Sequence, residues 1–118
     1  MRDIHDAASK GHAKARLAID VFVSEARRWI GGYFFQMDSA DALVFTAGIG
    51  ENRAELRAAI CANLDQLGLV LDLEKNAATR ATEAVISTTN SKVKVLVIPT
   101  NEELVIARET ARLTLPTA

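Results

Sequence analysis

The chain has 118 residues, enough for one compact domain and too few for two. Hydrophobic residues make up 49% and charged residues 25% of it, which is typical of a globular domain and excludes a disordered segment. With a net charge of −1, the chain gives no electrostatic reason to expect nucleic acid or a membrane surface as a partner. It has no apolar run as long as a membrane span and no secretory signal. Its single cysteine, Cys61, excludes an internal disulfide and favours the cytoplasm.

Residues 3–30 are predicted to be helical, because alanine is frequent there and proline is absent. Gly11 is expected to divide this region into a short and a long helix, and Gly31-Gly32 to end the long one. Apolar residues recur at intervals of three and four along one face, namely Ala18, Val21, Phe22, Ala26, Trp29 and Ile30. This stripe, including Trp29, is predicted to face the core.

A short apolar run at residues 41–46 has the length of a buried strand and no helical period. The glycines of 48–50 interrupt it, and residues 52–67 are predicted to form an amphipathic helix that ends before Gly68. Asn52 is the expected N-cap of this helix, with Glu55 completing a capping box.

Two further strands are predicted, a small one at 84–87 and a longer one at 92–99. Thr100 and Glu103 have the spacing of a capping box for a final helix, which is expected to end at Pro116. The order of elements predicts an α/β fold with parallel strands flanked by helices, in a single domain over 1–118. Two or three strands are few for a parallel sheet, so the sequence is predicted to be part of a larger sheet.

The junction between the first strand and its helix, residues 45–52, is a candidate ligand site. Its two glycines, Gly48 and Gly50, allow the backbone to approach a ligand, and a helix N-terminus favours phosphate. Ligands of open α/β sheets bind beyond the carboxyl ends of the strands. The segment matches neither a dinucleotide fingerprint nor a P-loop. A tight turn followed by a helix cap is therefore an equally good interpretation of these residues alone.

The second strand-to-helix junction, residues 99–103, carries two adjacent carboxylates. Glu102 and Glu103 have the chemistry to hold a divalent cation beside a nucleotide phosphate. Acidic residues in a first helical turn also stabilise a helix through its dipole, and Glu103 fits a capping box. Glu102 has no such local role, so it is the better metal candidate of the two.

Three other candidates have simpler explanations. His5 and His12 lack a third ligand in register and are expected to be solvated surface residues. Cys61 is expected to pack on its helix, because no basic residue is placed to activate it as a nucleophile.

At its two junctions the sequence resembles the acetate kinase family, which belongs to the sugar kinase, Hsp70 and actin superfamily. The matching strings are Phe-Thr-Ala-Gly-Ile-Gly-Glu-Asn at 45–52 and Ile-Pro-Thr-Asn-Glu-Glu-Leu-Val-Ile-Ala-Arg-Glu-Thr at 98–110. Leu-Asp-Gln-Leu-Gly-Leu at 64–69, Lys-Asn at 75–76 and the opening Met-Arg-Asp-Ile also match. The resemblance covers nearly the whole chain.

The resemblance implies the C-terminal, nucleotide-binding part of such a kinase, with a partial ribonuclease-H-like (actin-like ATPase) fold. The family transfers phosphate between ATP and acetate to give acetyl phosphate, with Mg²⁺, and this part contributes much of its homodimer contact. By resemblance, Glu102 would bind Mg²⁺. The residues implied in ATP or ADP binding are Arg2, Gly48, Ile49, Gly50, Glu51 and Asn52.

The family's catalytic arginines, phosphate-contacting histidine and acyl pocket have no counterpart here. The resemblance therefore implies no catalytic residue within this chain, acetate binding only through a missing N-terminal part, and an exposed sheet edge. The chain is expected to be inactive alone, as a truncated or fragmentary chain or as one piece of a split protein. Two alternatives remain open at this point. One is part of a propionate or butyrate kinase, and the other is a non-catalytic module for oligomerisation.

Overall fold

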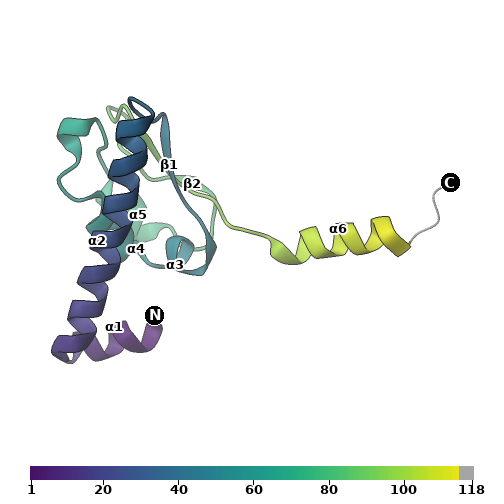
Figure 1. The fold of residues 1–118 in the computed structure, drawn as a ribbon, viewed down its shortest axis with the longest axis horizontal. Helices are drawn as coiled ribbons and strands as arrows, with labels where there is room; N and C mark the ends of the chain where they lie inside the picture. Colours follow the sequence, from purple (N-terminus) through teal and green to yellow (C-terminus); the bar gives the residue numbers. More distant parts are fainter. Residues whose placement is uncertain (115–118) are drawn as a thin grey trace.

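The computed structural model describes residues 1–114, which begin with two helices, α1 (Arg2–Ser9) and α2 (Ala13–Gln36), that meet at a corner (Figure 1). Gly11 lies between them with a φ of 84°, a left-handed conformation that glycine adopts without steric cost. The predicted interruption at Gly11 is therefore confirmed.

The predicted end of the long helix at Gly31-Gly32 is wrong. Helix α2 continues through both glycines to Gln36, although each glycine costs a helix interior about 1 kcal/mol relative to alanine. Ile30 and Phe34, on either side of the pair, both pack against the core of the domain. Tertiary packing thus outweighs the local preference to stop.

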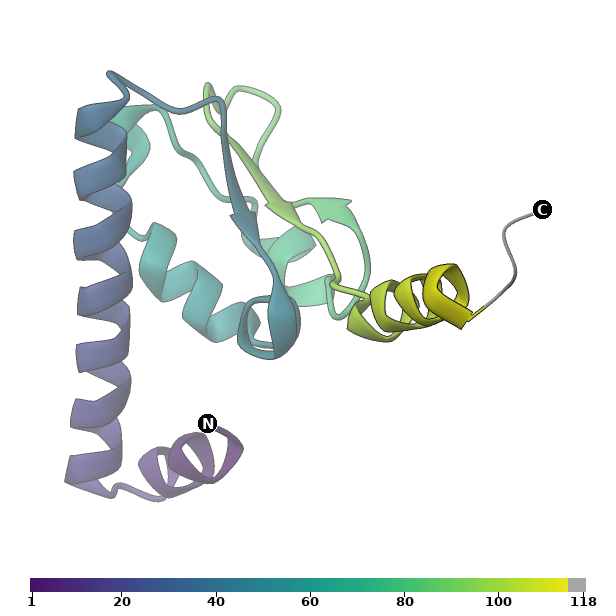
Figure 2. The ribbon, with the colours of Figure 1, turned by 45° about the vertical axis from the view of Figure 1, so that its right-hand side comes forward.

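Three strands form a mixed sheet in the order β1-β3-β2 (Figure 2). Strands β1 (Ala42–Phe45) and β3 (Lys94–Val97) are parallel, with Leu43 opposite Val95, as the sequence predicts. Strand β2 (Ala84–Val85) pairs antiparallel with β3. Among the described residues β1 is an outer strand, so its other edge is unpaired.

The segment between β1 and β2 does not form the single helix predicted over 52–67. It contains α3 (Ala47–Asn52), α4 (Ala54–Cys61), the 3-10 turn η1 (Asp65–Leu67) and α5 (Leu73–Ala78). The first helix forms within the glycine segment itself, and the chain changes direction at Arg53, whose φ and ψ are −120° and 82°. Asn63, at a φ of 57°, turns the chain again after α4.

The core lies between the sheet, α2 and α4. Its buried members are Phe45, Ile60, Cys61, Leu69, Ile86, Val93, Val95 and Val97. Three residues of α2 pack against this cluster, namely Phe22, Ala26 and Ile30. They are half of the predicted apolar stripe. Val21 and Trp29 belong to the other half and are 54% and 57% exposed, so the prediction that Trp29 faces the core is wrong.

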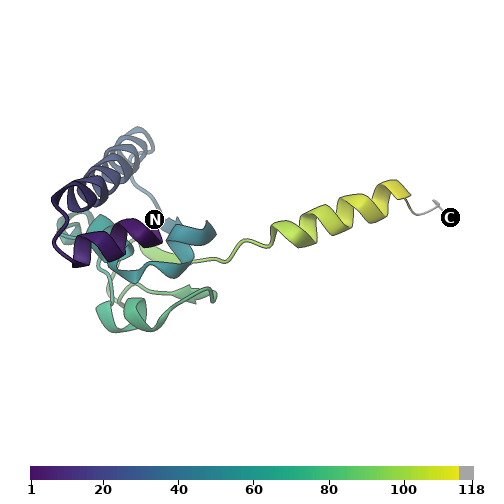
Figure 3. The same cartoon turned by 90° about the horizontal axis from the view of Figure 1, so that it is seen from below.

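Helix α6 (Glu102–Thr114) extends away from the rest of the molecule, and none of its residues is buried (Figure 3). It begins two residues after the predicted cap at Thr100. Its predicted end at Pro116 lies outside the described residues. Among the described helices, none is both long enough and apolar enough to cross a membrane.

Candidate functional site

The first strand-to-helix junction passes from β1 directly into α3. Thr46 is extended, and Ala47 follows with a φ of 58°, a left-handed conformation that costs a residue with a Cβ about 1–2 kcal/mol. A Cβ on Gly50 would lie 3.2 Å from the backbone carbon of Phe45, so Gly50 lets α3 pack tightly against the strand. A Cβ on Gly48 would meet no protein atom within 4 Å. The backbone at Gly48 is therefore open to a ligand.

The prediction that Asn52 caps the following helix is wrong. It is the last residue of α3, and its side-chain amide donates to the Gly48 carbonyl at 3.0 Å. Arg53 stands at the start of α4 and gives no side-chain cap, while Glu55 forms an ion pair with Arg53 at 3.4 Å. The predicted capping box is absent because the glycine segment forms a helical turn of its own.

A polar cavity of about 770 Å³ lies beside this junction. It is lined by Met1, Asp6, Gly48, Ile49, Asn52, Arg53, Glu55 and Arg80. Three of the predicted site residues, Gly48, Ile49 and Asn52, thus share one cavity with the first residue of the chain. Arg2 follows that residue, but its side chain lies outside the part of the structure that is described. Arg53 and Arg80 were not identified from the sequence, which gives no signal that they lie near Gly48.

Glu51, another predicted site residue, faces a different way. Its carboxylate is buried, with a residue exposure of 8%, and accepts hydrogen bonds from the Thr100 backbone N–H at 2.8 Å and hydroxyl at 3.1 Å. Because β1 and β3 are parallel neighbours, their carboxyl ends lie together, and Glu51 joins the two junctions there. The side chain of Glu51 therefore holds the backbone of Thr100 in place. Only the main chain of Glu51 is available to a ligand at the Gly48 segment.

Arg57 is the residue that holds the first junction from inside. It is fully buried, and its guanidinium donates to the carbonyls of Gly50 at 2.7 Å and Glu51 at 3.0 Å. It also donates to the side chain and carbonyl of Asn76, both at 2.8 Å, and to the Thr79 carbonyl at 2.7 Å. Burial lowers the pKa of Arg57, and the nearby Glu55 opposes this shift.

The sequence carries one signal for the buried position of Arg57. Arg57 follows Leu56 directly and lies three residues before Ile60, both of which are buried on α4. An arginine on the buried side of a helix needs internal acceptors, because an unpaired buried charge is very costly.

The second junction is more exposed than the first. Asn101 accepts a hydrogen bond from the Leu104 N–H at 2.9 Å, so its side chain caps α6, and the capping box predicted from Thr100 and Glu103 does not form. The reason is that α6 begins at Glu102, so Asn101 and not Thr100 stands directly before its first residue. Glu102 and Glu103 are both exposed in the first turn of α6.

The donor set at the second junction limits how Mg²⁺ could bind. Among the described residues no group of three or more His, Cys, Asp or Glu side chains could hold a metal ion. Mg²⁺ in kinases is commonly held by one or two carboxylates together with substrate phosphates. The single carboxylate of Glu102 therefore fits a metal ion that arrives with a nucleotide, and not a metal site built by this chain alone.

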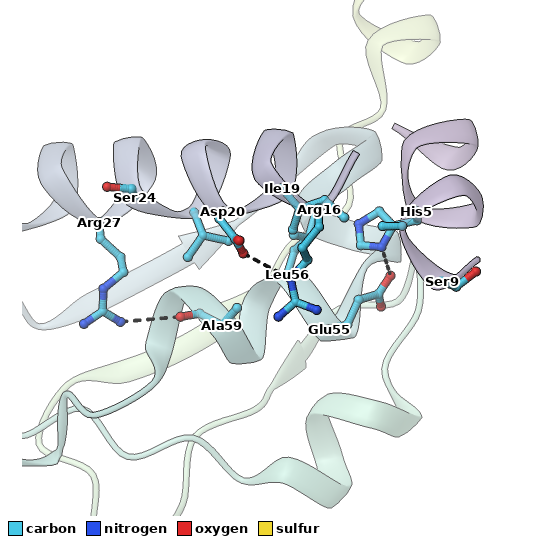
Figure 4. A pocket seen from close by; sticks show the side chains of 12 residues that line it. His5, Ser9, Arg16, Ile19, Asp20, Ser24, Arg27, Glu55, Leu56 and Ala59 are labelled. Carbon is cyan, nitrogen blue, oxygen red and sulfur yellow. Dashed lines mark hydrogen bonds and ion pairs between the residues drawn. The ribbon is translucent and has the colours of Figure 1, made fainter. Parts of the chain in front are cut away.

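A second cavity, of about 620 Å³, lies between α1, α2 and α4 (Figure 4). Its charged groups are used within the chain: Arg16 pairs with Asp20 at 3.4 Å, and Arg27 donates to the Ile60 carbonyl at 2.8 Å. His5 Nδ1 lies 3.7 Å from Glu55 Oε1. Its side chain is only 16% exposed, so the expectation that His5 is a solvated surface residue is wrong.

The other two minor candidates, His12 and Cys61, behave as the sequence predicts, although Arg27 and Arg57 do lie near Cys61, contrary to expectation. His12 is exposed, and its Nδ1 accepts from the Ala15 N–H at 3.3 Å as the cap of α2. Cys61 is buried in the core, and burial raises the pKa of its thiol to about 11. The thiol is therefore protonated at neutral pH, which argues against a nucleophilic role.

Comparison with known proteins shows the family to which this fold belongs. The model of the acetokinase family matches residues 1–108. The chain belongs to this family. It is 48% identical over 113 residues to the acetate kinase of Syntrophomonas wolfei and 53% identical over 109 residues to that of Methanosarcina thermophila. These matches cover 96% and 92% of this chain, but only 28% and 26% of the two relatives.

Solved structures give the same result. The acetate kinase of Porphyromonas gingivalis matches with a TM-score of 0.86 at 38% identity, over 95% of this chain and 28% of that one. A propionate kinase from Francisella tularensis matches with a TM-score of 0.78 at 41% identity, over 92% of this chain and 27% of that one. The predicted partial α/β kinase fold is thus confirmed. The chain spans little more than a quarter of its relatives' length, and the ligand roles of Arg2, residues 48–52 and Glu102 stay predictions.

Proposed function

We propose that this chain is the nucleotide-binding part of an acetate-kinase-type phosphotransferase, which transfers a phosphoryl group between ATP and acetate. The observation that carries the proposal is the polar cavity beside Gly48, where the glycine backbone is open and arginine side chains are near. The cavity lies beyond the carboxyl end of β1, and α/β folds bind ligands beyond the carboxyl ends of their strands. Acetate is named because relatives called acetate kinase reach 54% identity, in Treponema denticola.

In this proposal the chain binds and orients the nucleotide. Phosphoryl transfer depends on positioning and on charge around the moving group, and this chain would supply part of both. The open backbone at Gly48 would lie against the nucleotide, with Arg2 and Asn52 beside it, while Arg57 and Glu51 keep the segment in place. Glu102 would hold Mg²⁺, which would neutralise charge on the phosphates.

The remaining parts of the reaction are assigned outside this chain. The residues that bind acetate and stabilise the moving phosphoryl group would belong to the other three quarters of the enzyme, so we expect the isolated chain to be inactive. Choice of propionate or butyrate instead of acetate would be made there too. The single buried cysteine suits the reducing cytoplasm.

A second candidate function, self-association, is favoured by the outer face of α2. Large apolar side chains that are 54–61% exposed lie along it at multiples of four residues, with the charged Glu25 between the second and the third, namely Leu17, Val21, Trp29, Tyr33 and the C-cap Met37. Such a row is a ridge of the kind that packs into the groove of another helix. Exposed apolar side chains gathered on one helix face are typical of interaction sites, so this face suits a homodimer contact on either side of the Glu25–Arg28 ion pair.

Isothermal titration of the chain with ADP and with Mg-ATP tests the first candidate. Gly48→Val should abolish binding and leave the fold intact, because its side chain would occupy only the open space. Gly32→Val is the matched control, since Gly32 is equally open but lies on α2, away from the cavity. Absence of binding to the unmodified chain, with melting that depends on protein concentration and not on Mg-ADP, would support the second candidate instead.

A further inference from the structure

The loop between α5 and β2 is held at three consecutive residues. The Thr79 carbonyl accepts from buried Arg57 at 2.7 Å, and the Arg80 carbonyl accepts from the Thr82 hydroxyl at 3.0 Å. The N–H of Ala81 donates to the Glu51 carbonyl at 3.1 Å. Two of these three contacts come from the residues that also hold the Gly48 segment, namely Arg57 and Glu51. The loop and that segment are therefore parts of one rigid unit.

Ala81 adopts a φ of 46°, which is unusual for a residue with a Cβ. Such a conformation costs on the order of 1–3 kcal/mol, and it persists only where surrounding contacts determine it. Here it turns the chain directly after Arg80 and directs the Ala81 N–H to Glu51. The backbone that carries Arg80 is thus fixed in place by its neighbours before any ligand binds.

The side chain of Arg80 lines the cavity without an acidic partner. Its Nε donates to the Asn52 side-chain oxygen at a long 3.5 Å, and no described carboxylate lies within 4.0 Å of its nitrogens. Arg53, the other arginine at this cavity, is paired with Glu55 at 3.4 Å. The acidic Asp6 also lines the cavity and would repel an anion. An anion that binds there therefore needs a positively charged side chain that is not already paired with a carboxylate.

We propose that Arg80 binds the phosphate groups of a nucleoside diphosphate or triphosphate in this cavity. The inference rests on the proposed nucleotide-binding function and adds a residue to it. A guanidinium donates two parallel hydrogen bonds to phosphate oxygens, which makes arginine a geometrically specific phosphate ligand. The fixed loop means that little ordering of backbone is required for this contact.

Titrations with ADP and with adenosine test the inference, because only ADP carries the phosphates. Arg80→Ala should weaken ADP binding by about 10-fold or more, as expected for a lost hydrogen bond to a charged group, and leave adenosine binding unchanged. Arg80→Lys should recover part of the loss, since it keeps the charge without the planar fork. Arg16→Ala is the control, because Arg16 is also an exposed arginine but lies on α2, away from this cavity. This variant should bind both ligands as the unmodified chain does.

The possible failures can be told apart. ADP binding that is equal in Arg80→Ala and the unmodified chain would overturn the role of Arg80 and leave the proposed function standing. An equal loss for ADP and adenosine would also overturn it, because the residue would then be supporting the fold. If the unmodified chain binds neither ligand, the proposed function itself is wrong for this chain, and the role of Arg80 falls with it.

Discussion

The two strand-to-helix junctions have the same local pattern and very different surroundings. At the first, α3 is packed against Phe45 and is held from within by Arg57. At the second, β3 leads into α6, a helix without a single buried residue. Both junctions have turn residues and acidic side chains, so the sequence pattern does not distinguish them. What distinguishes them is that a buried arginine holds the first turn and joins it to α5, whereas among the described residues the second turn has bonds only to Glu51 and within its own residues.

This difference has a consequence for where stability is stored. The first junction is tied to α5 and to the loop beyond it, at 19 and 22 residues' separation, so its opening would require part of the domain to open. Apart from the contact of Glu51 with Thr100, the second junction depends on local bonds. We therefore expect substitutions at the first junction to change the stability of the domain. Substitutions in α6 should change only the order of that helix.

The largest effect is expected for Arg57→Met. The substitution removes five hydrogen bonds and leaves buried carbonyls without donors, so it should lower the free energy of unfolding by about 3 kcal/mol or more. Urea unfolding followed by circular dichroism measures this. Arg53→Met is the control, because Arg53 makes only an ion pair at partly exposed side chains and should change stability by less than about 1 kcal/mol. Equal effects of the two variants would mean that the first junction is not held from inside.

A smaller effect is expected at Glu51, which links the two junctions. Glu51→Ala removes the acceptor of two hydrogen bonds from Thr100 and should cost about 2 kcal/mol, the range for bonds to a charged group. Glu51→Gln keeps a side-chain oxygen in place and should cost clearly less than Glu51→Ala. The same urea titration compares them, and amide exchange at Thr100 should rise in Glu51→Ala alone. If the glutamine variant were as unstable as the alanine variant, the negative charge itself would be what joins the junctions.

Local signals in the sequence were sufficient for the elements whose surroundings agree with them. The parallel pair β1 and β3 was predicted from short apolar runs, and the division at Gly11 from a glycine that does adopt a positive φ. The continuation of α2 through Gly31-Gly32 was missed because packing of Phe34 decides it. The break at Arg53 is not predicted because it depends on Arg57 of α4, which donates to the carbonyls of Gly50 and Glu51 on α3. No periodicity of the sequence encodes these contacts.

The site follows the same rule. Gly48 and Asn52 lie four residues apart in the chain, so a local motif is enough to group them. Arg80 lies 28 residues beyond Asn52 and reaches the cavity only because the loop after α5 folds back onto α3. A single sequence carries no signal of that return. The buried position of Arg57, in contrast, could have been predicted from its place between apolar residues on α4.

The smallest effect is expected in α6, where Asn101 provides the cap. Asn101→Ala should weaken the helix by about 1 kcal/mol, the usual cost of a lost N-cap, whereas Glu103→Ala removes no hydrogen bond and should change it less. Because α6 is 13 residues long and unpacked, it is near the limit at which a helix persists in water, so a lost cap should lower its helix content visibly. Cα chemical shifts of residues 104–113 measure this, and the urea midpoint of the domain should not move. A shift of that midpoint in Asn101→Ala would mean that α6 packs against the domain in solution, and the contrast between the two junctions would then be lost.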